Sequence, residues 1–71
     1  MAKNWTNESI WNAAFGPYET CVSVLVEAEI QSITPQDYVR SCLVEAREQG
    51  ADFELDAAFA SVCRQLGVAV S

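Results

Sequence analysis

Apolar residues recur every three or four positions along most of the chain, and prolines and glycines interrupt this pattern. The interruptions at Gly16-Pro17, Thr34-Pro35, Gly50 and Gly67 divide the chain into four segments. Recurrence at this spacing is typical of amphipathic helices that bury one face. The sequence therefore predicts an all-α fold of three to four short helices.

The first segment is predicted to be a helix from about Thr6 to Phe15. Thr6 or Asn7 can cap its start, and Gly16 followed by Pro17 ends it. Its apolar stripe comprises Ile10, Trp11, Ala14 and Phe15. We expect Trp11 and Phe15 to fill a core or a dimer interface, because large aromatic side chains dominate the cores of small domains.

The last two segments give the clearest helical patterns. Thr34 and Pro35 start the first of them, and Asp52 is expected to cap the second. The predicted buried faces comprise Tyr38, Val39, Cys42, Leu43 and Ala46 in one helix, and Leu55, Ala58, Phe59, Val62, Cys63 and Leu66 in the other. The expected loop between these helices is only Gly50-Ala51, so the sequence predicts an antiparallel helical hairpin.

The second segment, from Pro17 to about Ser32, has two interpretations. As a helix it begins at Pro17 and buries a broad face that comprises Tyr18, Cys21, Val22, Leu25, Val26 and Ala28. As a strand it shows alternation and a high content of β-branched residues. The length of the segment favours a helix. The alternative is an α+β fold with a strand at about 20–30.

The length and composition predict one small helical domain over residues 1–71. The chain is 51% hydrophobic, which is too apolar for a disordered segment. A core this small is thin, so we expect homodimerisation to complete it. The three cysteines lie in apolar stretches and are odd in number, which predicts free, buried thiols rather than disulfides. With no secretory-type apolar run near the N-terminus and no membrane-spanning segment, we expect a cytoplasmic protein.

The charge of the chain narrows the class of partner. Ten acidic residues outnumber four basic ones, and the net charge is −6. Nucleic-acid backbones and anionic membranes both require a basic surface, so neither is an expected partner. An acidic surface instead steers association toward a basic protein.

The residues needed for common catalytic and metal sites are missing from the sequence. Histidine is absent, and Cys21, Cys42 and Cys63 form no Cys-x-x-Cys pair. Asp52, Glu54 and Asp56 alternate like the start of a calcium loop, but Ala57 and Cys63 stand where that loop needs glycine and glutamate. We therefore expect no metal, no cofactor and no enzymatic activity.

The aromatic N-terminal segment and the acidic residues of the second half are the candidate partner-binding residues. They comprise Trp5, Trp11, Glu45, Glu48, Asp52, Glu54 and Asp56. Trp5 precedes the first helix and is expected to be an exposed anchor. The predicted function is non-enzymatic protein binding, as an inhibitor or adaptor that occludes a basic, nucleic-acid-handling protein. Such small acidic inhibitors are typical of phages and mobile elements. The alternative is a structural subunit of a larger assembly.

Overall fold

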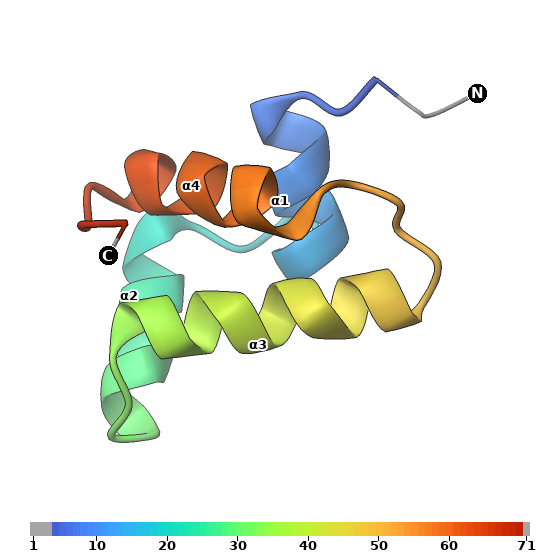
Figure 1. The fold of residues 1–71 in the computed structure, drawn as a ribbon. Coiled ribbons are helices and arrows are strands. Elements are labelled where there is room, and N and C mark those ends of the chain that lie inside the picture. The colour runs from blue at the N-terminus through green and yellow to red at the C-terminus, as the bar shows by residue number, and fades with distance from the viewer. Residues whose placement is uncertain (1–3, 71) are drawn as a thin grey trace.

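The computed structural model describes residues 4–70, and every regular element in that range is a helix. The helices are α1 (Asn7–Phe15), α2 (Cys21–Ile30), α3 (Pro35–Glu48) and α4 (Leu55–Leu66) (Figure 1). The predicted all-α class is confirmed. Residues 20–30 form no strand, so the α+β alternative is wrong.

Threonine side chains begin the first three helices. The Oγ1 atoms of Thr6, Thr20 and Thr34 each accept a hydrogen bond, at 3.1 Å, from the backbone N–H three residues later. Ser9 and Ser23 complete capping boxes, because their Oγ atoms accept from the threonine N–H groups at 2.8 and 2.9 Å. The cap of α2 is therefore Thr20, and the expectation that Pro17 starts this helix is wrong.

Three of the helices end in the same hydrogen-bonded turn, a Schellman motif. At the end of α2, the N–H of Ile33 donates to the carbonyl of Ala28, and the N–H of Ser32 donates to that of Glu29. The motif needs a residue of positive φ, which is Ser32 (59°) after α2, Gly50 (112°) after α3 and Gly67 (76°) after α4. Serine pays a steric cost in this conformation that glycine does not.

The connection between α3 and α4 is longer than the sequence indicated. It spans residues 49–54, so the predicted two-residue loop at Gly50-Ala51 is wrong. The cap of α4 is Glu54 rather than Asp52, and its carboxylate accepts from the N–H groups of Asp56 and Ala57 at 3.3 and 2.7 Å. Phe53 lies in the middle of this connection and is buried. One aromatic side chain therefore anchors the connection to the core.

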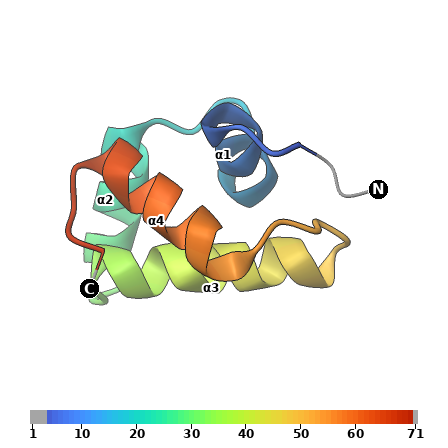
Figure 2. The same cartoon turned by 45° about the horizontal axis from the view of Figure 1, so that its top comes forward.

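The core lies between α1, α3 and α4. It comprises Ile10, Trp11, Val24, Val39, Leu43, Ala46, Phe53, Ala58, Phe59, Val62, Cys63 and Leu66. Figure 2 shows α4 crossing over α3, with α1 beside them. The predicted core faces of α3 and α4 are confirmed, with Tyr38, Cys42 and Leu55 half-buried at their edges.

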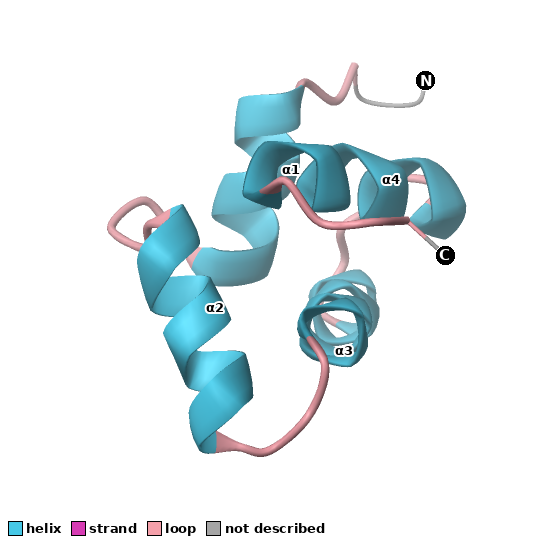
Figure 3. Cartoon of the chain, turned by 90° about the vertical axis from the view of Figure 1, so that its left-hand side faces the viewer, coloured by secondary structure: helices cyan, strands magenta, loops and turns pink. Residues whose placement is uncertain are grey.

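Helix α2 stands at the edge of the molecule. Figure 3 shows it apart from α1, with α3 on one side of it. Only Val24 and Ala28 of this helix are buried. The contribution of α2 to the core is therefore small compared with that of α4.

None of the helices within residues 4–70 has both the length and the apolar character needed to cross a bilayer. The longest, α3, has 14 residues, whereas a span needs about 20.

Candidate functional site

Five of the predicted binding residues surround the α3–α4 connection. Glu45 and Glu48 project from α3, Asp52 and Glu54 lie in the connection, and Asp56 is in the first turn of α4. All five are exposed. We call this surface the acidic corner. Between positions 45 and 56 the only basic residue is Arg47, so the charge of the corner is predominantly negative.

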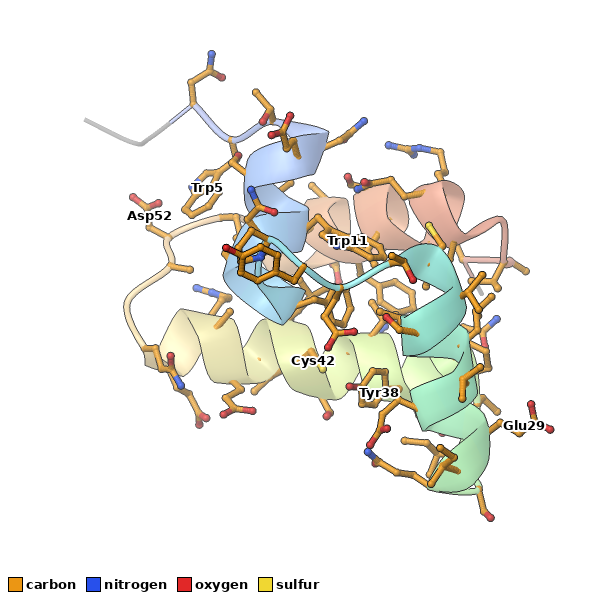
Figure 4. The ribbon with its side chains drawn as sticks, turned by 180° about the vertical axis from the view of Figure 1, so that it is seen from behind. Trp5, Trp11, Glu29, Tyr38, Cys42 and Asp52 are labelled. Carbon is orange, nitrogen blue, oxygen red and sulfur yellow. The ribbon has the colours of Figure 1, made fainter. Side chains whose placement is uncertain are left out.

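Trp5 supports the acidic corner from the N-terminal segment. Its Nε1–H donates a 2.7 Å hydrogen bond to Oδ1 of Asp52, as the positions of the two side chains in Figure 4 illustrate. Its ring packs edge-on against Phe53, with the ring centroids 5.2 Å apart. Trp5 is half-buried, so the expectation of an exposed anchor is wrong. A role of Trp5 in binding stays a prediction, with positioning of Asp52 as the contact that the structure supplies.

Trp11 belongs to the core rather than to the surface. Its side chain is buried, and its ring centroid lies 4.7 Å from that of Phe15, which is half-buried. Its Nε1–H donates to the carbonyl oxygen of Glu19 at 3.1 Å, which satisfies the one polar atom of the ring. The expected core position is confirmed for Trp11, and Phe15 packs against the core from its edge. Contact between Trp11 and a partner stays a prediction.

A surface hollow of about 410 Å³ lies where α1, α2 and α4 meet. Its lining comprises Asn7, Glu8, Trp11, Glu19, Thr20, Cys21 and Gln65. The Cys21 thiol is exposed and donates to the carbonyl oxygen of Gln65 at 3.4 Å. This exposure contradicts the expectation that all three cysteines are buried. Among the lining residues no basic group is present to activate the thiol as a nucleophile.

The other two thiols are held in their neutral form. Burial raises the pKa of Cys63, and it also raises that of Cys42, which the hydroxyl of Tyr38 opposes only in part. Burial and the neighbouring Cys42 also raise the pKa of Tyr38, to about 12. Neutral thiols at physiological pH are poor nucleophiles and poor metal ligands. On α3, Tyr38 and Cys42 therefore contribute to packing.

No group of three or more potential metal ligands forms among the described residues 4–70. Two of the three alternating carboxylates, Asp52 and Glu54, have other partners instead. Asp52 accepts from Trp5, and Glu54 caps α4. The acids of this segment thus hold the start of α4 and its connection in place.

A second surface, which the sequence analysis missed, lies on α2. The broad apolar face predicted for this helix is wrong in part, because Val24 and Ala28 point inward and the residues on the opposite side remain exposed. Tyr18 is 95% exposed, Val22 and Ile30 are each 70% exposed, and Val26 is 46% exposed. We call Tyr18, Val22, Val26, Ile30 and Ile33 the α2 stripe.

The C-terminal end of α2 lies far from the acidic corner. Figure 4 shows Glu29 of α2 and Asp52 of the corner at opposite ends of the molecule. The described chain is elongated, with principal extents of 38 × 23 × 18 Å. Glu29 is therefore separate from the acids of the corner.

Comparison of the chain with protein-family models, with curated proteins and with solved structures finds no match to any of them. The two surfaces are therefore the features of the molecule from which a function can be inferred.

Proposed function

We propose that this protein is a non-enzymatic binding module, an inhibitor or adaptor that covers a basic surface of another protein. The observation that supports this proposal is the acidic corner, where exposed carboxylates from two helices surround one connection. Surfaces of one sign accelerate the encounter with a partner of opposite sign and exclude partners of like sign.

The architecture of the connection suits a binding role. Phe53 is buried and Trp5 packs on it, so the backbone that carries Asp52 and Glu54 is fixed before a partner arrives. A preorganised surface loses less conformational entropy on binding than a mobile one does. The acids therefore present a defined pattern of charge to a basic protein, for which a nucleic-acid-handling protein is our candidate.

We predict that neutralising the corner weakens capture of the partner. The double substitution Glu45→Gln with Glu48→Gln changes the net charge from −6 to −4 by removing two negative charges. Both residues are exposed, so the melting temperature should change little. The measurement is quantitative mass spectrometry of proteins captured from lysate of the source cells, followed by association kinetics with the purified partner. We expect association at low ionic strength to slow about three- to tenfold.

A matched control separates the position of the charge from its amount. Asn12→Lys with Ala13→Lys also gives −4, because it adds two positive charges on the exposed side of α1. This variant should capture the partner nearly as well as the unchanged protein. Equal losses in both variants would show that only net charge matters, and would contradict a docking role for the corner.

The second candidate function is a structural subunit of a larger assembly, and the exposed α2 stripe favours it. Subunits that assemble permanently bury apolar surfaces, and their association depends little on salt. Binding that is unaffected by salt, and by neutralisation of Glu45 and Glu48, would favour this alternative over the inhibitor.

Homodimerisation is a separate proposal, because small domains often need a second copy for stability. Sedimentation at micromolar concentration then reports about twice the chain mass of 7.8 kDa. A single species of 7.8 kDa with a sharp thermal transition would contradict it.

A further inference from the structure

Helix α2 is apolar on two opposite sides, and only one of these faces the core. Val24 and Ala28 are almost fully buried, whereas Val22 and Ile30 each keep 70% of their surface exposed. A helix at the surface of a protein normally carries polar residues on the side that faces solvent, so an exposed apolar side is unusual. A contiguous apolar patch on a small protein marks an interaction site.

Three exposed apolar residues of α2 lie in one row along the helix. Val22, Val26 and Ile30 follow one another at intervals of four, which places them on one side of the helix. Tyr18 before α2 and Ile33 after it add two further exposed apolar side chains near the ends of the helix. Ridges of residues at four-residue intervals are the surfaces against which a second helix packs. The stripe therefore has the shape of a docking surface for one helix.

The charge around the stripe indicates what charge a docking helix of a partner should carry. Positions 4–39 contain no lysine or arginine, and their acidic residues are Glu8, Glu19, Glu27, Glu29 and Asp37. Glu29 is exposed, precedes Ile30 in the chain and projects away from the body of the molecule (Figure 4). The first base after this stretch, Arg40, lies over the ring of Phe59, 4.4 Å from its centroid.

A second copy of the chain is a poor partner for the α2 stripe. Two α2 stripes brought together would place the acids of both copies at one interface, and residues 4–39 of neither copy supply a base. An anionic bilayer is repelled for the same reason. A helix that carries lysine and arginine beside its own apolar ridge meets both the shape and the charge of this surface.

We propose that the α2 stripe is the docking site for an amphipathic, basic helix of a protein partner. This inference rests on the proposed function in taking the partner to be basic. Because the stripe comprises residues of α2 and its flanks, whereas the acidic corner comprises residues of α3, α4 and their connection, each can be disabled without the other.

Three synthetic helical peptides test the proposal with isotope-labelled full-length protein. The first has a leucine ridge flanked by lysines, the second has the same ridge flanked by glutamates, and the third keeps the lysines but has alanines in the ridge. We expect only the first to bind, with amide shifts in the NMR spectrum concentrated at α2. Equal binding of the first two peptides, or shifts centred on the acidic corner, would overturn the proposal.

Matched substitutions localise the contact. Val26 on α2 and Val44 on α3 have similar exposure, at 46% and 40%, so Val26→Gln and Val44→Gln are comparable changes. We expect Val26→Gln to weaken binding of the first peptide severalfold, the double change Val22→Gln with Ile30→Gln to weaken it at least about tenfold, and Val44→Gln to have less than a twofold effect. Glu29→Gln should reduce the dependence of binding on salt. Similar effects of Val26→Gln and Val44→Gln would overturn the proposal.

Two further measurements separate this inference from its premise. If sedimentation shows a dimer that Val22→Gln with Ile30→Gln converts to a monomer, a second copy occupies the stripe and the proposal is wrong. If the natural partner is lost on neutralising Glu45 and Glu48 but retained when Val22 and Ile30 are replaced, the proposed function stands and the α2 docking site does not.

Discussion

Replacing Leu43 or Phe59 by alanine should destabilise the protein more than changes elsewhere in α3 and α4. Leu43 has no exposed surface, and Phe59 is almost fully buried. Truncating a buried leucine costs about 2–5 kcal/mol and a buried phenylalanine about 3–5 kcal/mol, because transfer free energy is lost and a cavity remains. A domain of this length has a total stability of roughly 4–10 kcal/mol. Either substitution therefore removes a large part of it.

Chemical denaturation followed by circular dichroism measures this loss. Val44→Ala is the matched control for Leu43→Ala, because Val44 is the next residue of α3 and is 40% exposed. It should cost much less. Where the alanine variants do not fold, Phe59→Leu keeps most of the volume and should cost less than about 1.5 kcal/mol. A change in midpoint no larger for Leu43→Ala than for Val44→Ala would show that α3 does not bury the face assigned to it.

The helices of this protein could be predicted from sequence where a local signal was unambiguous. Thr34 followed by Pro35 marks the start of α3, and Gly67 marks the end of α4, because these residues suit the backbone at those points. The end of α2 lacked such a signal. Ser32 takes the left-handed conformation that glycine adopts after α3 and α4. The sequence therefore contains no glycine there to indicate the end of the helix.

The orientation of α2 could not be derived from its own sequence. Val22, Val24, Val26 and Ala28 lie on different sides of the helix, and each side is apolar enough to be buried. Which side faces inward depends on the neighbours in space. Val24 belongs to the core, Leu25 packs against it half-buried, and Ala28 is buried. Val22 and Val26 stay exposed.

The candidate site depended on contacts between distant parts of the sequence. The exposed acids at 45–56 could be recognised from composition and periodicity. The hydrogen bond from Trp5 to Asp52, however, joins residues 47 positions apart, and no local pattern indicates it. The burial of Phe53 could not be predicted because this residue lies in a connection, where the periodicity of helices does not apply.

The second large effect is expected at Phe53, because it fastens the acidic corner to the core. Phe53 is almost fully buried, and the ring of Trp5 meets it edge-on at 77°. Phe53→Ala should cost about 3–5 kcal/mol, as at other buried phenylalanines. It also removes the ring on which Trp5 rests, and Trp5 holds Asp52. The loss should therefore appear both in global stability and in the order of residues 49–54.

A double-mutant cycle with Trp5→Ala and Phe53→Ala separates these contributions, with Phe53→Leu replacing Phe53→Ala if the latter does not fold. Edge-to-face aromatic pairs are worth about 0.5–1.5 kcal/mol beyond the area they bury, so the two substitutions should be non-additive by that amount. Trp5→Phe keeps the ring contact but deletes the Nε1–H donor, and should shift the NMR signals of Asp52 with little change in stability. Hydrogen exchange of the amides at 49–54 should accelerate in Trp5→Ala and Phe53→Ala, and much less in Trp5→Phe. Additive effects, with unchanged exchange in the connection, would mean that the corner is held by its own backbone turn and that Trp5 packs there without positioning Asp52.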